Sequence, residues 1–379
     1  MDLAGEVASL DRSTLDPIVA RAVGRPVAIG EWRSVPFSYQ VTNALSAGIF
    51  RISGAALDGG ADWSVVLKVL QPAYDALLSR FPMESRAELE DAYRWDREVL
   101  AYESGLFDRL PRGFAAPQAL AIDRRADRCW LWLEDLGGDG ARWDIARYAL
   151  AARHLGRFNG AFPEGTFDAP WLTRRWLRTW LLTGFGSRAQ FVLDNDAVWA
   201  HPAVHAGFAK DARDRLRRRW ADRRVLLDRL LARPHTLCHL DAFRKNLFDR
   251  SGETVAIDWS YVGLAPIGAE VGHLVMGSVA FAEHGHDTPT LARASLDAYL
   301  DGLRESGWRG DERDVREGFA LSATRWVFML GWMGAMLDPV RAAQMEQWSG
   351  QPLAVQIAEA GERTTYLLDL LDDADTDRL

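Results

Sequence analysis

The chain has 379 residues, which is long enough for two or three domains with a large hydrophobic core. Hydrophobic residues make up 48% of it and charged residues 26%, a composition typical of soluble globular proteins. The formal net charge of −8 gives no basic footprint for nucleic acid, and no apolar run reaches the length of a membrane span. Two cysteines are too few for a disulfide scaffold, and the start lacks the basic and apolar regions of a signal peptide. We therefore expect a cytoplasmic protein without nucleic-acid or membrane partners.

The first third of the chain predicts a helix followed by a small sheet. A glycine and a proline close the helix, and turn residues separate runs that are rich in β-branched and aromatic residues. The helix is expected over residues 14–22, and the strands over residues 27–32, 48–53, 63–70, 119–123 and 129–133. Between the third and fourth strands, a capping box at Ser85 to Glu88 begins a second helix, which is expected to continue to Leu106.

Two charged residues in this region lie beside apolar positions. Lys68 is near the end of the third strand, on a side where a lone charge is unfavourable unless an anion meets it. Glu98 is on the flank of the apolar stripe of the second helix. The alternatives are a solvated lysine on an edge strand and a solvated glutamate, since Glu90 and Glu103 show that glutamates are common on this helix.

After Gly138 the pattern is helical, with one exception near residue 240. Residues 211–233 are strongly basic, which suits either a nucleic-acid stripe or a solvated helix face. Leucines at core spacing and acid–base pairs four residues apart favour the solvated face. The acidic end of the chain, residues 369–377, is expected to be frayed.

The exception has the spacing H-x-D-x-x-x-x-N of a kinase catalytic loop, formed by His239, Asp241 and Asn246. Asp258 follows twelve residues later, and a predicted hairpin over residues 247–257 brings Asn246 and Asp258 side by side. Phosphoryl transfer from ATP needs a carboxylate that accepts the hydroxyl proton and further oxygen donors that hold Mg²⁺. The three side chains are of these types and in this order. The alternative is a chance motif beside an ordinary hairpin.

These motifs resemble those of the aminoglycoside phosphotransferase and choline-kinase-like superfamily of small-molecule kinases. The resemblance covers about residues 27–274, because the strand lysine and helix glutamate precede the catalytic loop in the expected order. It implies an α+β, bilobal protein-kinase-like fold. The N-lobe, residues 1–134, is expected to hold a small antiparallel sheet with one main helix, and the C-lobe, residues 135–379, to be mostly helical.

The resemblance also implies roles for individual residues. Asp241 is expected to be the catalytic base, His239 to brace the metal-binding segment, and Glu270 to steady the catalytic loop. Asn246 and Asp258 are expected to hold Mg²⁺. The residues expected to bind the nucleotide are Lys68, Glu98, the hinge residues Glu134 and Leu136, and Arg244, with Lys245 as the alternative to Arg244.

One feature departs from the protein-kinase pattern. The loop over residues 34–47 contains no glycine, so the glycine-rich cover of the phosphates is missing. Polar residues of the loop are the candidates to replace it: Ser38, Gln40, Thr42, Asn43 and Ser46.

The implied activity is that of an ATP- (or GTP-) dependent, Mg²⁺-requiring kinase for a hydroxyl of a small molecule such as an aminoglycoside, amino sugar or amino alcohol. Only eleven residues separate Asp258 from Glu270, which leaves no room for the activation segment and A-P-E motif of protein kinases. A nucleotide-binding pseudokinase scaffold and a protein kinase are the alternatives, and the oligomeric state stays open. Several tryptophans are candidates to line the acceptor cleft, with burial in the core as the alternative for each: Trp171, Trp176, Trp180, Trp326 and Trp332.

Overall fold

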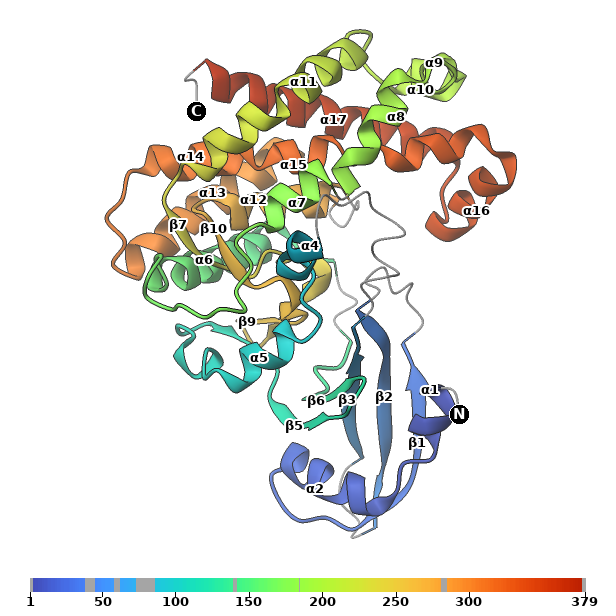
Figure 1. The fold of residues 1–379 in the computed structure, drawn as a ribbon, viewed down its shortest axis with the longest axis vertical. Helices are drawn as coiled ribbons and strands as arrows, with labels where there is room; N and C mark the ends of the chain where they lie inside the picture. The colour runs from blue at the N-terminus through green and yellow to red at the C-terminus, as the bar shows by residue number, and fades with distance from the viewer. Residues whose placement is uncertain are drawn as a thin grey trace.

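The computed structural model describes residues 3–37, 45–57, 62–72, 86–138, 142–183, 185–280 and 285–376. Figure 1 shows a sheet at the lower end of the molecule, formed by the N-terminal part of the chain, and a larger helical body above it. The predicted α+β class, with a sheet-bearing N-terminal part and a mostly helical C-terminal part, is confirmed.

The N-terminal sheet has five antiparallel strands in the order β1-β2-β3-β6-β5. Because side chains alternate along a strand, β3 turns Val65, Leu67 and Val69 into one core and Lys68 to the opposite side. Each predicted strand is present, although several begin or end at different residues. Their bounds are Ile29–Pro36 (β1), Ser46–Ala56 (β2), Trp63–Leu70 (β3), Ala119–Arg124 (β5) and Cys129–Glu134 (β6).

Two helices, α1 (Leu3–Ala8) and α2 (Arg12–Val23), pack against the face of the sheet opposite to Lys68. The Asp11 carboxylate accepts the N–H of Thr14 and so starts α2 ahead of the predicted residue 14. The helix ends at Gly24, whose φ of 73° is the left-handed conformation expected of a glycine cap.

The second predicted helix is in fact two helices, which corrects the single helix expected over residues 85–106. The guanidinium of Arg97 is buried and donates to the carbonyl oxygens of Ala92 and Asp91. The last carbonyls of a helix have no intrahelical partner, so Arg97 satisfies two of them and ends the first helix. The two helices are α4 (Arg86–Ala92) and α5 (Arg97–Glu103).

Helices form most of the C-terminal part, where α6 and α13 approach closely. A side chain at Gly156 of α6 would collide with the carbonyl of Tyr299, and one at Gly302 of α13 with that of Arg153, so the approach needs glycine at both positions. None of the described helices is both long and apolar enough to cross a membrane. The helices of this part are α6 (Ile145–Ala161), α7 (Trp176–Leu182), α8 (Ala189–Asp194), α9 (Asp196–Ala200), α10 (Pro202–Gly207), α11 (Ala212–Leu231), α12 (Ala269–Ala280), α13 (Thr288–Glu305), α14 (Glu312–Leu321), α15 (Ala323–Val327), α16 (Pro339–Ser349) and α17 (Leu353–Asp375).

Short strands frame the predicted catalytic segment, and the predicted hairpin is confirmed as β8 and β9. Its turn consists of Ser251 (φ 52°) and Gly252 (φ 87°), the pair of positive φ angles that suits a two-residue hairpin. The N–H of Ile257 donates to the carbonyl of Asn246 at 2.9 Å, which holds Asn246 beside the segment that ends in Asp258. β9 also pairs with β4, and β7 pairs with β10. The strands are β4 (Phe114–Ala115), β7 (His235–Cys238), β8 (Leu247–Arg250), β9 (Glu253–Ala256) and β10 (Gly263–Pro266).

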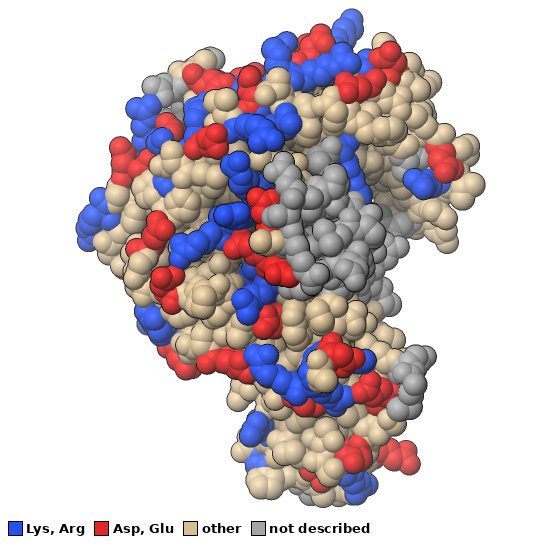
Figure 2. All heavy atoms as spheres, viewed as in Figure 1, with Lys and Arg blue, Asp and Glu red and all other residues tan. Residues whose placement is uncertain are grey.

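The acidic end of the chain is helical, which corrects the expectation of a frayed tail. Arginines of α11 form ion pairs with aspartates of α17, and Figure 2 shows basic and acidic side chains together at the top of the molecule, where these helices lie. The basic side of α11 is therefore matched by an acidic helix from far along the chain. The paired residues are Arg215, Arg219 and Arg229 with Asp369, Asp372 and Asp375.

Candidate active site

Lys68 lies at the centre of the site. Its Nζ is 2.5 Å from Oε2 of Glu98 and 2.7 Å from Oδ1 of Asp258, so β3, α5 and the end of the hairpin meet at one ammonium group. Lys68 and Glu98 are buried, whereas 30% of the Asp258 side chain is exposed. The structure thus brings Lys68 and Glu98 within ion-pair distance, as the sequence predicted, and adds a second carboxylate to the pair.

These charges determine one another's ionisation. Burial disfavours the charge on Lys68, but the carboxylates of Asp258 and Glu98 outweigh it, so the pKa of Lys68 lies above its ordinary value. Burial also disfavours the charge on Asp258, and here Lys68 and a hydrogen bond from Ser260 outweigh it, so the pKa of Asp258 is lowered. At neutral pH, Lys68 is therefore an ammonium held by carboxylates, a group that can also bind the oxygens of a phosphate.

The backbone at Asp258 is strained. Its φ of 61° and ψ of 63° lie in the left-handed region, which costs a residue other than glycine on the order of 1–3 kcal/mol. The following turn, η4 (Trp259–Tyr261), is held by Glu98, which accepts the N–H of Trp259 at 3.3 Å. Ser260 donates its hydroxyl to Oδ1 of Asp258 at 2.7 Å. Strained residues gather at functional sites, and this strain turns the Asp258 carboxylate toward Lys68.

The catalytic loop is braced from two sides. Leu240 also has a positive φ, of 66°, and the buried Glu270 accepts the N–H groups of both His239 and Leu240. His239 accepts the N–H of Asp241 on Nδ1 at 3.2 Å, and its Nε2 donates to the carbonyl of Ile257 at 2.9 Å. The loop is thereby tied to α12 by Glu270 and to the hairpin by His239, which are the positions that the sequence predicted for both braces.

Asp241 and Asn246 contact each other directly. Nδ2 of Asn246 donates to Oδ2 of Asp241 at 2.9 Å and to its main-chain carbonyl at 3.0 Å. Since the amide nitrogen faces Asp241, the amide oxygen of Asn246 is left for another partner. Burial, with the charge of Asp258, raises the pKa of Asp241 to about 6. Such a carboxylate is ionised at neutral pH and is still basic enough to accept a proton from a reacting hydroxyl.

Asn246 and Asp258 fit a magnesium–nucleotide complex. They supply an amide oxygen and a carboxylate, the ligand types that Mg²⁺ takes. Among the described residues, no cluster of three or more His, Cys, Asp or Glu side chains that could hold a metal occurs. Mg²⁺ is commonly bound by one or two protein ligands together with substrate phosphates and water, so a pair of oxygen donors suits a cation that arrives with a nucleotide.

The predicted hinge follows β6. The N–H of Glu134 donates to the carbonyl of Gln118 at 3.0 Å, and its carboxylate pairs with Arg250 at 2.9 Å, so Glu134 is engaged within the protein. Leu136 is half-buried, and its main chain makes no hydrogen bond to another described residue. Of the two predicted hinge contacts, Leu136 is the one whose backbone groups are available to a ligand.

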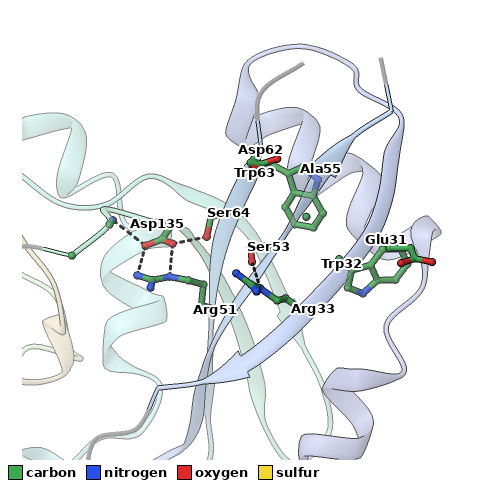
Figure 3. A pocket seen from close by; sticks show the side chains of 13 residues that line it. Glu31, Trp32, Arg33, Arg51, Ser53, Ala55, Asp62, Trp63, Ser64 and Asp135 are labelled. Carbon is green, nitrogen blue, oxygen red and sulfur yellow. Dashed lines mark hydrogen bonds and ion pairs between the residues drawn. The ribbon is translucent and has the colours of Figure 1, made fainter. Parts of the chain in front are cut away.

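A hollow of about 700 Å³ opens where the hinge meets the sheet (Figure 3). Within it, Arg51 of β2 pairs with Asp135 of the hinge through Nε–Oδ2 and Nη2–Oδ1 contacts of 2.6 Å and 3.0 Å. Ser64 of β3 donates to the same carboxylate at 2.5 Å. This arrangement, for which the sequence carried no signal, fixes the hinge against the sheet. The residues that line the hollow do not include Lys68 or Asp241, so it lies beside the catalytic groups and not over them.

Arg244, predicted to contact the nucleotide, is buried. Its guanidinium carbon lies 4.5 Å from the ring centroid of Trp143, and Nη1 donates to the carbonyl of Leu247 at 3.2 Å. Lys245, the alternative, is exposed. The nucleotide-binding role of either residue stays a prediction.

The loop predicted to cover the phosphates is described only at its ends. Ser46 lies at the start of β2, where it is buried and its hydroxyl has no hydrogen-bond partner among the described residues. Ser46 therefore stays a candidate to bind a phosphate oxygen. The other candidates lie outside the described residues, as does the first residue of the capping box: Ser38, Gln40, Thr42, Asn43 and Ser85.

Sequence reasoning missed two side chains beside Asp241. Nε2 of His273 lies 3.3 Å from Oδ1 of Asp241, and Arg325 of α15 contacts the other ring nitrogen of His273. His273 follows Glu270 by three residues on one helix, a spacing that puts both side chains on the same side of the helix. This spacing is the sequence signal that could have pointed to His273. No motif points to Arg325. Of the tryptophans considered as cleft walls, Trp332 is half-buried, and the buried ones are Trp171, Trp176, Trp180 and Trp326.

No protein-family model matches the chain, and no curated protein matches it significantly. Solved structures do match: an aminoglycoside phosphotransferase from Alicyclobacillus acidocaldarius superposes with a TM-score of 0.51 and 15% identity, over 92% of this chain and 93% of that one. The chain has the protein-kinase-like fold of the aminoglycoside phosphotransferases. The predicted fold is thus confirmed.

Two further kinases are similar to the chain over most of their length. A choline kinase from Cryptosporidium parvum matches with a TM-score of 0.49 and 12% identity, over 93% of this chain and 91% of that one. An amicoumacin kinase in complex with AMP-PNP and Ca²⁺ matches with a TM-score of 0.47 and 12% identity, over 93% and 97%. Identities this low establish the fold alone, so the function has to be argued from the site.

Proposed function

We propose that this protein is an ATP-dependent, Mg²⁺-requiring kinase that phosphorylates a hydroxyl group of a small molecule. The observation that carries the proposal is the pair of bonds from Lys68 to Glu98 and to Asp258, because they join three distant segments in the arrangement that a kinase uses for phosphates and metal. We place the boundary between the two lobes after Glu134, where β6 ends and the hinge begins.

Each residue of the site has a task in this reaction. Asp241 orients the acceptor hydroxyl and takes its proton as the oxygen attacks the γ-phosphorus, and the bond from the γ-phosphorus to the bridging oxygen breaks so that ADP leaves. Lys68, kept in place by Glu98, binds the α- and β-phosphates, and the backbone of Leu136 pairs with the base. Asn246 and Asp258 would hold Mg²⁺, which supplies positive charge against the phosphates. Positioning and electrostatics then account for most of the rate enhancement.

A small-molecule acceptor is favoured by the segment after Asp258. The turn η4, strand β10 and the start of α12 take up this segment except for Val262, Ile267 and Gly268, so no extended platform for a peptide follows the metal-binding residue. A pseudokinase scaffold is the second candidate. It is disfavoured because Asp241, Asn246 and Asp258 are all present, with Asn246 bonded to Asp241 and held beside the segment that ends in Asp258, whereas a pseudokinase typically lacks one of them.

The test is to measure ADP or GDP release from Mg²⁺·ATP and Mg²⁺·GTP with a panel of aminoglycosides, amino sugars and amino alcohols, and with mixed proteins as a separate acceptor. We expect turnover with at least one small hydroxyl compound, and none in the presence of EDTA. Transfer to proteins with none to any small compound would reject the acceptor class. Nucleotide binding without turnover under every condition would favour the scaffold.

Asp241→Asn provides the control within the site. It should lower kcat by about 10² or more and leave nucleotide binding nearly unchanged, because it removes the proton acceptor and keeps the shape of the side chain. Asp249→Asn, in the exposed part of the same hairpin, should keep normal turnover. Near-normal turnover of Asp241→Asn would remove Asp241 from the mechanism.

A further inference from the structure

Two buried side chains behind Asp241 form a line of contacts that ends at its carboxylate. Nη1 of Arg325 lies 2.7 Å from Nδ1 of His273, and Nε2 of His273 lies 3.3 Å from Oδ1 of Asp241. Arg325 belongs to α15 and His273 to α12, so the contacts connect two helices of the C-terminal part with the catalytic loop. Neither Arg325 nor His273 has a role in the reaction proposed above.

The chemistry of these groups determines where the proton of His273 lies. A guanidinium only donates hydrogen bonds, so Nδ1 of His273 is an acceptor and carries no proton. A neutral imidazole then carries its proton on Nε2, the nitrogen next to Asp241. We propose that Arg325 and His273 are positioning residues for Asp241. Arg325 holds the imidazole of His273 as the Nε2–H tautomer, and this N–H faces Oδ1 of Asp241.

Arg325 is buried among aromatic rings and forms no direct ion pair with a carboxylate of the described residues. Its guanidinium carbon lies 4.9 Å from the ring centroids of Trp180 and Trp326 and 5.4 Å from that of Trp176, and Nη1 also reaches the carbonyl of Leu240 at 3.4 Å. Among the described residues no carboxylate lies within ion-pair distance, and the buried Nε has no partner. A buried charge of this kind is costly, and the negative charge of Asp241 offsets part of the cost together with three indole rings, so a packing role alone explains it poorly.

The surroundings of His273 keep it neutral. Burial, and then the positive charge of Arg325, lower the pKa of His273 well below its ordinary value. The contact with Asp241 is not aligned as a hydrogen bond, and Nε2 has no other partner among the described residues. Catalytic hydrogen bonds often tighten when the substrate complex forms, and a small rotation of the Asp241 carboxylate completes this one.

The consequence is that each oxygen of Asp241 has a donor beside it. Asn246 donates to Oδ2, and the N–H of His273 faces Oδ1, so rotation of the carboxylate is restricted once the second contact tightens into a hydrogen bond. This inference rests on the proposed function, because the group that is positioned is the proposed base. Supporting groups of this kind matter since a misplacement of about 1 Å can cost about 10² in rate.

The first test reads the tautomer and needs no acceptor. In protein labelled with ¹³C at the histidine ring carbons, the Cδ2 shift of His273, assigned with His273→Gln, should report the Nε2–H tautomer at pH 7. Arg325→Met should convert it to a mixture of tautomers, whereas Arg325→Lys should preserve it, because an ammonium also only donates. His239, whose Nδ1 accepts the main-chain N–H of Asp241, serves as the internal control and should show the Nε2–H tautomer in every variant. An Nδ1–H or imidazolium form of His273, or no change in Arg325→Met, would overturn the assignment.

The second test reads turnover with the acceptor found in the screen. His273→Leu should lower kcat by about tenfold or more and change the KM for ATP by less than about threefold, because it loosens the base and touches no nucleotide group. His273→Gln, which can place an N–H near the position of Nε2, should recover most of the loss, and His154→Gln should be neutral as a second buried histidine. An equal loss in the Gln and Leu variants, or none in either, would refute the positioning role. Should no acceptor be turned over by the wild type, the proposed function fails, while the tautomer test still decides the role of Arg325.

Discussion

Single residues of this site act mainly through the charges they bring together. Lys68 bonds to carboxylates that lie 30 and 190 residues away in the chain, and its positive charge favours the ionised form of both against the effect of burial, which still leaves the pKa of Glu98 above its ordinary value. The two are not equivalent. Glu98 is 1% exposed, so it depends on Lys68, whereas Asp258 keeps 30% exposure and also receives the hydroxyl of Ser260. Removal of the cation and removal of one anion should therefore have different results.

We predict that Lys68→Ala costs more than Glu98→Ala, both in the KM for ATP and in the free energy of unfolding. The lysine variant leaves Glu98 buried without a cation, a loss on the order of 3–5 kcal/mol for a broken buried pair. The glutamate variant leaves Lys68 bonded to Asp258. Steady-state kinetics and urea unfolding measure the two effects, with Glu90→Ala on α4 as the control for the helix pair. A larger loss in Glu98→Ala would contradict this order.

At the scale of elements, the site depends on how short segments are ended and joined. Arg97 ends α4, starts α5, and also donates to the carbonyls of Trp171 and Ser260. The residue next to it, Glu98, is thereby held at the end of α5 that faces Lys68. The hairpin plays the same part for Asn246 and Asp258, since its register sets them beside each other. The junction at Arg97 thus places Glu98, and the hairpin places Asn246 and Asp258.

Arg97→Met should destabilise the protein by on the order of 3 kcal/mol, because it leaves several buried carbonyls without their charged donor. We expect the KM for ATP to rise as well, since α5 carries Glu98. Arg94→Met is the matched control three residues earlier, where the arginine is 41% exposed and pairs with Asp96. Urea unfolding of both variants measures the difference, and equal stabilities would show that the junction does not depend on Arg97.

At the scale of the whole molecule, two features far from the site hold the helical body together. The basic side of α11 meets the acidic end of α17, and α6 is packed against α13 by glycines on both helices. Buried His154 of α6 adds a third feature, since its Nδ1 contacts the hydroxyl of Thr254 in β9 at 3.0 Å. These contacts join segments from the middle and the end of the chain.

Arg219→Met should lower the free energy of unfolding by about 1 kcal/mol at low salt, because the arginine pairs with both Asp372 and Asp375. The aspartates are partly exposed, so the loss should shrink as the ionic strength rises. Arg217→Met, at an exposed position on the same helix, is the matched control and should have no effect. Denaturation curves at low and high salt make the comparison, and a salt-independent loss would point to packing in place of charge.

The free energy of unfolding should also depend on His154 at acid pH. Burial lowers the pKa of His154 to about 4, while an unfolded histidine titrates near 6.5. Between these values the folded state binds fewer protons, so stability falls as the pH is lowered through this window. His154→Gln should remove this part of the loss, which amounts to roughly 2–3 kcal/mol. The test is the difference between the two proteins at pH 7 and pH 4, and an identical pH dependence would refute it.

The sequence by itself determined the local elements and the main groups of the site. Asp241 and Asn246 lie within one short loop, and a tight hairpin links them to Asp258, so their proximity follows from nearby backbone geometry. The apolar patterns placed Lys68 on a strand and Glu98 on a helix, and the resemblance to kinases then implied their roles. For Asp241, Asn246 and Asp258, the spacing along the chain already limits how far apart they can be.

Tertiary structure decided what depends on residues far apart in the chain. The break before Arg97 is set by carbonyls and by the buried Trp171 and Ser260 segments, which no helical pattern reveals. The acidic tail is helical because α11, more than a hundred residues earlier, matches its charge. Arg325 contacts His273, and His273 lies next to Asp241, only once three segments have packed. In each case the partner is chosen by burial and charge in space, and those are properties of the folded chain that local spacing does not contain.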